Sequence, residues 1–242
     1  MWRACAVLLL WAIGGVVAAE PLRLAANAWP PFTDARLLNN GLASDLVNTA
    51  LARAGYATVQ SEVPWARALL GLQHGRFDAV VGAWYSAERT AFGYFSKPYL
   101  INRIRFVQRR GSGVRFTQLA DLYGYRIAVS RGYAYSPAFD SDAQLHKTEV
   151  SDFSAAARMV QAQRLDLTLE DEYVARYLFS RELADIQGDL EFLPQPLSES
   201  NLYLLVSRQH PQHRQIVEAF DRAMEAMRAD GSYAQIFQRH GL

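Results

Sequence analysis

The sequence predicts an α/β protein with two lobes. Short apolar or β-branched runs alternate with longer segments of helical period, which is the pattern of a sheet covered by helices. The alternation begins again after Pro98, and half of the 242 residues are hydrophobic, enough for two small cores. Two α/β units of about 100 residues each fit the usual size of domains better than one continuous unit.

The first unit reads as strand, helix, strand, helix, strand. Its strands are expected at residues 22–26, 58–63 and 78–82. Apolar residues recur at helical spacing from Leu42 to Leu51, and Gly55 is placed to end that helix. A second helix runs through residues 69–72 and ends near Gly75. Connections between such strands should be right-handed.

The second unit contains more strands. They are expected at residues 103–108, 126–130, 146–150, 165–169 and 202–206, with helices around residues 155–163 and 173–179. We expect Pro194 and Pro196 to interrupt the regular structure before the last strand. A final long helix presents one apolar face from Ile216 to Met227, and Gly231 follows as its stop.

The first 19 residues have the layout of a cleaved signal peptide. Arg3 supplies a short positive stretch, residues 4–17 are uncharged and apolar, and small residues lead up to Ala19. A membrane anchor is the alternative, but the apolar run is shorter than the roughly 20 residues that span a bilayer. We therefore predict export with cleavage near Ala19.

Charge and cysteine content argue against several functions. Without the leader, 24 basic residues would face 24 acidic ones, and no basic cluster is visible along the chain. Such a chain is a poor binder of nucleic acid or of an anionic membrane surface. Cys5 is the only cysteine and lies inside the leader, so the mature chain would have no disulfide, thiol nucleophile or thiolate metal site.

Three short motifs follow one another along the chain. The first combines DAVVG at residues 78–82 with SAER at 86–89 and FSKPY at 95–99. The second is LDLTLEDE at 165–172, and the third is MRADGSY at 227–233. Together they resemble the family 3 extracellular solute-binding proteins, which supply polar amino acids to ABC importers. The resemblance spans essentially the whole mature chain.

The resemblance implies a type II periplasmic-binding-protein fold with a ligand cleft between the lobes. It places residues 20–100 and 203–242 in lobe 1 and residues 101–202 in lobe 2, with a hinge of two crossover strands. It also implies a periplasmic monomer that captures a small amino-acid-like ligand for an inner-membrane ABC permease. Ligands of open α/β units bind at the carboxyl ends of strands, so residues at strand ends become the candidates.

Arg89 is the first candidate, because its position matches the family arginine that grips the α-carboxylate of the ligand. A guanidinium can donate two parallel charge-assisted hydrogen bonds to a carboxylate, a geometry that lysine cannot reproduce. The alternative is a solvated arginine in the first turn of a helix. The surrounding motif favours the ligand role.

Two adjacent acids form the second candidate group. Asp171 aligns with the family aspartate that accepts the ligand's ammonium group, and Glu170 could instead meet a cationic ligand side chain. An unpaired ammonium in a desolvated cleft would be costly, so a zwitterionic ligand needs a carboxylate there. The alternative is an acidic helix N-terminus favoured by the helix dipole, and both interpretations can hold together.

Three tryptophans fall where the family lines its cleft. Trp29 lies in the loop after the first strand, Trp65 in a loop with Arg67, and Trp84 just past the third strand. Their rings could stack on an aliphatic stem, an aromatic ring or a cation. Core packing is the ordinary role of tryptophan, and the strand-end position favours the cleft most clearly for Trp29. Arg67 is a weaker candidate.

The chain departs from the family where hydroxyls usually help to hold the α-carboxylate. Gly82 and Trp84 stand at positions of serine or threonine, and residues 132–134, Gly-Tyr-Ala, stand where Gly-Thr-Thr or Gly-Thr-Ser is common. Tyr133 and Ser130 could supply replacement hydroxyls. The departures indicate an amino-acid-like carboxylate other than the usual polar amino acids, or a shifted pose.

The sequence does not predict an enzyme. Common signatures such as G-x-S-x-G, H-E-x-x-H, a P-loop or G-x-G-x-x-G after a strand are missing. His210 and His213 flank Pro211 without a third ligand nearby, whereas a structural zinc needs four. We expect neither a cofactor nor a metal.

Two other functions stay open. A few enzymes share this fold, including dehydratases of cyclohexadienyl acids, and Glu170 or Asp171 could be the acid or base that such an enzyme needs. A sensor that presents its closed state to a membrane receptor is the third interpretation. Product formation would favour the enzyme, and a closed-state complex with a receptor ectodomain would favour the sensor.

Overall fold

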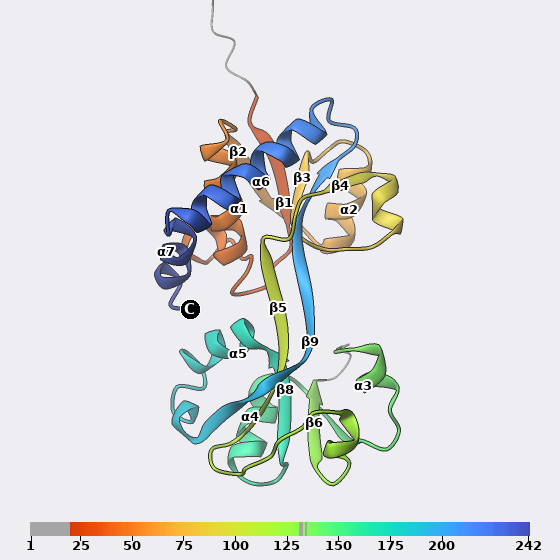
Figure 1. Cartoon of the computed structure of the whole chain (residues 1–242), viewed down its shortest axis with the longest axis vertical. Helices are drawn as coiled ribbons and strands as arrows, with labels where there is room; N and C mark the ends of the chain where they lie inside the picture. Colours follow the sequence, from red (N-terminus) through yellow and green to blue (C-terminus); the bar gives the residue numbers. More distant parts are fainter. Residues whose placement is uncertain (1–19, 131–132, 134) are drawn as a thin grey trace, which may run out of the picture.

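Two lobes stacked along the long axis make up the molecule (Figure 1). The computed structural model describes residues 20–130, 133 and 135–242, so the expected signal peptide, Gly132 and Ala134 lie outside the described residues. One sheet runs through both lobes with strand order β2-β1-β3-β9-β5-β8-β6-β7, and β4 (Gly93–Phe95) pairs with β9. The predicted two-lobed α/β class is confirmed. Within the described part, no helix is both long and apolar enough to span a bilayer.

The upper lobe is a mixed sheet with helices on both faces, in which β9 is antiparallel to its neighbours β3 and β4. Strand β1 (Leu22–Ala26) lies between β2 (Thr58–Glu62) and β3 (Ala79–Trp84) and is parallel to both. Because side chains alternate along a strand, Leu24 packs with α1 (Leu42–Arg53) and α6 (His213–Ala229), whereas Ala25 packs with α2 (Trp65–Gln73) on the other face. The lobe is completed by α7 (Ser232–Arg239) and the short η1 (Leu38–Asn40) and η2 (Glu88–Ala91).

The lower lobe repeats this plan with the same order of strands, since β6 lies between β7 and β8 as β1 lies between β2 and β3. Strand β6 (Arg126–Ser130) is parallel to β7 (His146–Val150) and β8 (Leu167–Asp171). Ala128 faces α4 (Phe153–Gln161) and α5 (Glu172–Phe179), whereas Ile127 faces the core that contains Phe139 of α3 (Pro137–Ser141). The short η3 (Leu119–Leu122) and η4 (Gln187–Asp189) lie in its connections.

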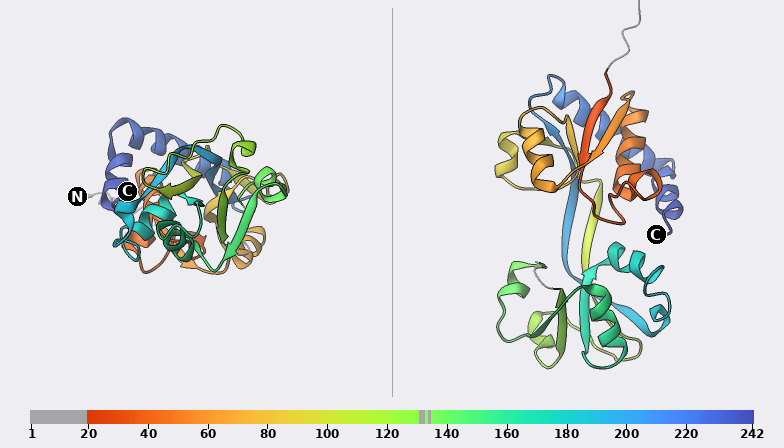
Figure 2. Two further views of the ribbon diagram at one scale, coloured as in Figure 1. Left: turned by 90° about the horizontal axis from the view of Figure 1, so that it is seen from below. Right: turned by 180° about the vertical axis from the view of Figure 1, so that it is seen from behind.

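A ribbon of two antiparallel strands joins the lobes. Strand β5 (Leu100–Arg109) pairs with β9 (Leu190–Ser207) from Leu100 opposite Leu202 to Arg109 opposite Leu190. Figure 1 and the right view of Figure 2 agree that this ribbon crosses between the lobes. Movement of one lobe against the other must therefore bend or twist this ribbon.

The prediction that Pro194 and Pro196 interrupt the structure is wrong, because β9 continues through both residues. In this stretch β9 pairs with β5 only, while its other neighbour, β3, is paired further along at residues 202–206. Proline lacks a backbone N–H, but at an open sheet edge that group has no partner strand to bond. The register of β5 against β9 shifts on both sides of Arg105, and these shifts accommodate the prolines.

Three further elements differ from the expectation. Trp65 begins α2, so Trp65 and Arg67 lie on a helix and not in a loop. Trp84 is the last residue of β3 and does not follow it. Gly231 ends one helix with a positive φ of 80°, which glycine adopts without strain, but it also starts α7, a helix that the sequence did not predict.

Candidate functional site

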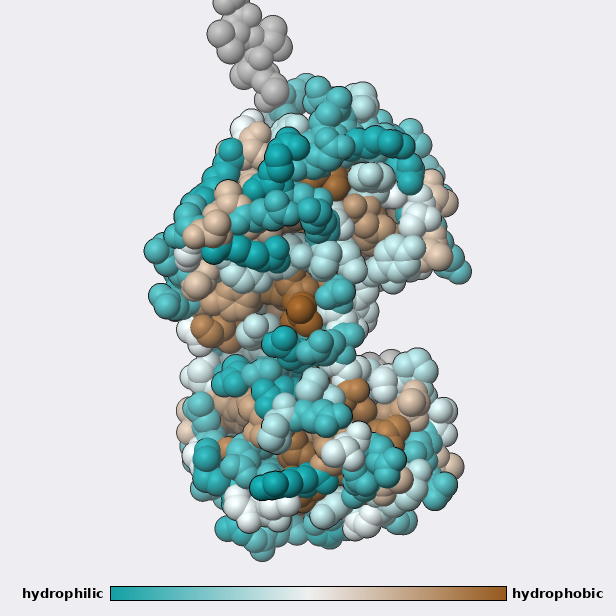
Figure 3. Space-filling view, viewed as in Figure 1, coloured by the Kyte–Doolittle hydropathy of each residue, from teal (hydrophilic) through white to brown (hydrophobic). Residues whose placement is uncertain are grey.

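A cleft between the lobes brings the predicted ligand-binding residues together. It consists of a cavity of about 440 Å³ and an adjoining one of about 80 Å³, which share Trp29, Trp84 and Tyr133. The predicted residues that line it are Trp29, Trp65, Gly82, Trp84, Arg89, Tyr133 and Asp171. Trp84 and Tyr133 are 50% and 43% exposed, so the cleft is open. Figure 3 shows the molecule hollowed between the lobes on the side of α2 and α3.

Arg89 lies on η2, shortly after the end of β3. Its Nη1 donates to the carbonyl oxygen of Trp84 at 2.7 Å, and its Cζ lies 5.2 Å from the ring centroid of Trp65. It forms no ion pair with any carboxylate of the described residues. The guanidinium is thus held by a carbonyl and a ring and keeps donors for an anionic ligand.

Aromatic rings form the wall of the upper lobe around this arginine. The rings of Trp29 and Trp84 meet edge to face, with centroids 5.8 Å apart, and Trp29 also packs on buried Phe32 at 4.5 Å. The Nε1 of Trp84 donates to the Oδ1 of Asn102 at 3.1 Å. This hydrogen bond fixes the orientation of an indole that is otherwise half exposed.

Asp171 forms the floor of the cleft at the end of β8. It caps α5, since its Oδ1 accepts from the backbone N–H groups of Tyr173 at 2.9 Å and Val174 at 3.1 Å, and its Oδ2 accepts from Asn102 at 3.1 Å. The side chain is almost completely buried, and burial raises the pKa of Asp171 to about 6, although these hydrogen bonds oppose the shift. The helix-cap interpretation and the ligand interpretation are therefore compatible.

Glu170 is buried directly beside Asp171 and does not line the cleft. Its Oε1 accepts from the backbone N–H of Asp171 at 2.8 Å. Burial, together with the charge of Asp171, raises the pKa of Glu170 to about 7, and the hydroxyl of Tyr133 opposes the shift by donating a hydrogen bond. Burial therefore disfavours the doubly ionised state of this buried acid pair, Glu170 and Asp171.

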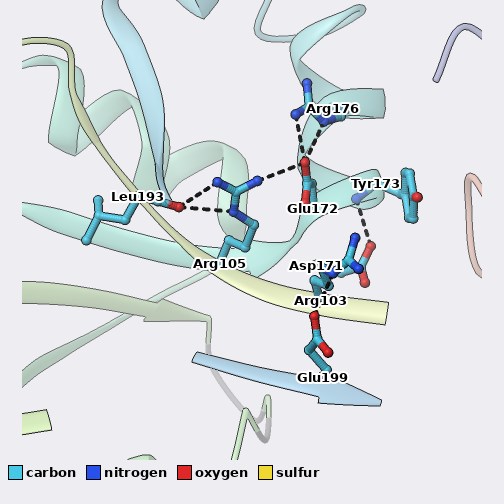
Figure 4. Close-up of polar contacts among 8 residues, drawn as sticks. All are labelled: Arg103, Arg105, Asp171, Glu172, Tyr173, Arg176, Leu193 and Glu199. Atoms are coloured by element: carbon cyan, nitrogen blue, oxygen red, sulfur yellow. Dashed lines mark hydrogen bonds and ion pairs between the residues drawn. The ribbon is translucent and has the colours of Figure 1, made fainter. Parts of the chain in front are cut away.

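The neighbouring arginines bind a different acid. Arg105 and Arg176 hold Glu172 at 3.0 and 2.7 Å, as Figure 4 shows, and these contacts lower the pKa of Glu172 although burial alone would raise it. Among the described residues, no arginine, lysine or histidine forms an ion pair with Glu170 or Asp171. A cationic ligand group would therefore meet a carboxylate that is not paired with a cation of the described residues.

Two predicted residues besides Glu170 lie outside the cleft lining. Arg67 is exposed on α2, and the backbone N–H of half-buried Ser130 donates to the hydroxyl of Tyr135 at 2.8 Å. Sequence reasoning missed Asn27, Asn102, Ile104, Tyr135 and Ser200, all of which line the cleft. Asn27 directly follows β1, so the strand-end rule could have identified it. Ser200 lies on the ribbon, where no local pattern marks it.

No group of three or more His, Cys, Asp or Glu side chains comes together as a metal site in the part of the chain that the structure describes. The polar groups that line the cleft are instead one arginine, one aspartate, neutral amides and hydroxyls. Such a set can hold a small zwitterion by charge and hydrogen bonding.

Fold and cleft together define a two-lobed solute-binding protein. The chain matches the bacterial extracellular solute-binding proteins, family 3, over residues 22–242 and belongs to this family. The family resemblance of the three sequence motifs is thereby confirmed, and the family is a family of binding proteins. None of the curated proteins matches this chain.

Solved structures with the same fold include several amino acid-binding proteins. Substrate binding domain 2 of GlnP from Lactococcus lactis, in its open conformation, has a TM-score of 0.73 at 17% identity, covering 92% of this chain and 95% of its own. An ancestral cationic amino acid solute binding protein has a TM-score of 0.71 at 22% identity, covering 90% and 94%. The substrate binding protein of an amino acid ABC transporter has a TM-score of 0.60 at 19% identity, covering 91% and 98%.

Proposed function

We propose that this protein is a periplasmic receptor that captures a small amino-acid-like ligand by closure of its lobes and delivers it to an ABC permease of the inner membrane. The observation that carries the proposal is the pairing of opposite charges across one cleft. Arg89 on one wall has no carboxylate partner among the described residues, and Asp171 on the other has no cationic partner there. A zwitterion would satisfy both.

Binding would proceed in two steps. The ligand carboxylate first accepts hydrogen bonds from Arg89 in the open cleft, and the ammonium group then recruits Asp171 from the other lobe. Only the closed state makes both contacts, so the ligand shifts the open–closed equilibrium by its higher affinity for the closed state.

The aromatic lining supports a ligand with an extended side chain. Three tryptophans and Tyr133 surround the cavity next to Arg89. Aromatic rings gain most from an aliphatic stem, another ring or a cation, and they offer few hydrogen-bonding groups to a short polar side chain. We therefore expect that the preferred ligand is larger and less polar than serine or aspartate.

Several finer statements belong to the same proposal. The leader is removed near Ala19 and the mature chain works as a monomer in the periplasm. The moving units are residues 20–100 with 203–242 and residues 101–202. The extracellular family supports the location outside the cytoplasm, and the layout of residues 1–19 supports the cleavage.

The first test is a thermal-shift screen of the refolded mature protein against amino acids, small peptides, polyamines and aromatic carboxylates. A ligand that binds only the native state raises the melting temperature by mass action. We expect a shift with one or a few carboxylate-bearing amines, and at least a tenfold weaker affinity in Arg89→Ala. Arg67→Ala is the matched control, because this arginine is exposed on the same lobe outside the cleft.

Two results would contradict the proposal. Equal affinity of Arg89→Ala and the unchanged protein would remove the carboxylate contact on which the pose depends. Conversion of any carboxylic acid in the same incubations, detected by mass spectrometry, would replace the receptor function with an enzymatic one.

A further inference from the structure

The ribbon between the lobes has a second cavity on its other face. Alternation along β5 directs Asn102 and Ile104 into the ligand cleft and Ile101 and Arg103 into a separate cavity of about 550 Å³, here called the rear cavity. On β9, Ser200 lines the cleft and its neighbour Asn201 lines the rear cavity. Figure 1 shows α5 and α7 on this side of the ribbon and α2 and α3 on the other.

The rear cavity does not have the chemistry of an anion site, although two arginines line it. Arg103 is paired with Glu199 at 2.7 Å, and Arg228 donates to the carbonyl oxygen of Tyr99 at 3.0 Å and lies over the ring of Tyr233. Both guanidinium groups are already engaged. The cavity is therefore a gap between two moving parts and not a site for a charged ligand.

Aromatic rings bridge the gap from one lobe to the other. Tyr173 of α5 lies 5.6 Å from Phe237 of α7 and 6.0 Å from Phe32, centroid to centroid, and Phe237 also contacts Tyr233 at 5.0 Å. Tyr173 packs together with Val174 against the core of the upper lobe. We call the contacts of Tyr173 with Phe237 and Phe32 the rear contact.

The rear contact and the acid of the cleft belong to one turn of one helix. Asp171 caps α5 and lines the cleft, while Tyr173, two residues later, lines the rear cavity. In Figure 4 the ring of Tyr173 points away from the cluster of Arg105, Glu172 and Arg176. The start of α5 thus extends past the hinge on both sides.

We propose that the rear contact holds the lobes open and sets ligand affinity without touching the ligand. The two sides of a hinge move in opposite directions, so a rotation that carries Asp171 toward Arg89 separates Tyr173 from Phe237 and Phe32. The contact stabilises only the open state. The inference rests on the proposed closure mechanism and adds residues that determine its equilibrium.

The energetic consequence follows from population shift. Apparent affinity is the intrinsic affinity reduced by the fraction of molecules that can close. Loss of one or two aromatic contacts should raise the closed fraction, and with it the affinity for any closing ligand, by about three- to tenfold.

The test needs no ligand. Cys5 is the only cysteine in the sequence and lies in the leader, so the mature protein is a cysteine-free background that accepts two spin labels, at Ala66→Cys in α2 and Ala143→Cys just after α3. Pulsed electron paramagnetic resonance then gives the distance distribution across the cleft mouth. We expect Tyr173→Ala and Phe237→Ala to shift the distribution toward shorter distances relative to the unsubstituted background.

Two controls separate the rear contact from a loss of packing in general. Tyr173→Phe keeps the rings and should keep the original distribution. Tyr85→Ala removes a ring that contacts Phe95 at 5.2 Å within the upper lobe and should also leave it unchanged. An unchanged distribution in folded Tyr173→Ala and Phe237→Ala, checked by circular dichroism, would overturn the inference even if amino acids bind. A shift in both would support it even if the ligand proves to be of another class.

Discussion

Buried acids without cations are the feature of single residues that most affects function. Three consecutive carboxylates close β8 and open α5, yet only Glu172 has arginine partners, while Glu170 and Asp171 have raised pKa values. The sequence identified Asp171 from its motif. The i,i+4 spacing of Glu172 and Arg176 on α5 is local, but the second partner, Arg105, reaches Glu172 only after β5 and α5 pack together.

The raised pKa values predict a pH dependence of ligand binding. The pKa of Asp171 is about 6, above the unfolded value, so the charged form that binds an ammonium group develops as the pH rises through 6. Affinity should be about tenfold lower at pH 5 than at pH 8, and ligand binding near pH 6 should release protons. Isothermal titration in buffers of different ionisation enthalpy measures both. Asp171→Asn should bind weakly with a flat profile, and a flat profile in the unsubstituted protein would contradict the assignment.

The raised pKa of Asp171 has the opposite effect on the stability of the ligand-free protein. A carboxyl whose folded pKa is raised binds its proton more tightly in the folded state, so its contribution to stability falls as the pH rises from about 4 toward 6. Because the affinity is higher at pH 8, the ligand-induced rise in melting temperature should be larger at pH 8 than at pH 5, although the ligand-free protein loses this contribution to its stability.

At the scale of elements, α7 is the longest of the parts that the sequence did not predict, which also include α3 and β4. Its eight residues follow Gly231 directly, and only Ile236 among them is buried. Its end is held by the buried Asp45 of α1, which contacts Nε2 of His240 at 3.0 Å and Nη1 of Arg239 at 3.3 Å. These contacts join residues almost 200 positions apart, so no local pattern could reveal them.

The burial of the two contacts predicts unequal effects of substitution. The side chain of His240 is 6% exposed, so His240→Ala leaves the buried Asp45 carboxylate without one of its two partners at 3.0 Å, the other being Asn39, and should destabilise the protein by about 1–3 kcal/mol. The side chain of Arg239 is 47% exposed, and Arg239→Ala should cost less than about 1 kcal/mol. Urea unfolding midpoints measure the difference. Equal losses of unfolding free energy in the two variants would contradict the prediction that burial determines the strength of these contacts.

At the scale of the whole molecule, the cleft contains every tryptophan of the described residues. Trp29, Trp65 and Trp84 all line it, and Trp84 is half exposed in this open form. Closure around a ligand should therefore move the emission maximum to shorter wavelength and protect the fluorescence from acrylamide. Trp84→Phe should remove most of the change, and a ligand that raises the melting temperature without changing the emission would argue against closure over this site.

The sequence by itself determined the two-lobed α/β class, the family and most strands. Alternating apolar residues such as Leu24 and Ala25 already specify two covered faces, and three short motifs carry the family resemblance. It also identified Arg89 and Asp171 as candidates, and the structure brings both to one cleft. Local patterns suffice for these features because they depend on neighbouring residues or on positions inherited with the fold.

Only the tertiary structure decided which surfaces meet across the hinge. The continuous path of β9 through Pro194 and Pro196 depends on an open sheet edge, and the role of Asn102 depends on Trp84 and Asp171, which come from different lobes. The rear contact joins Tyr173 to Phe237 in the same way. Each of these features depends on side chains that are distant in sequence, and their distances are set only when both cores have formed and the ribbon has fixed the lobes relative to each other.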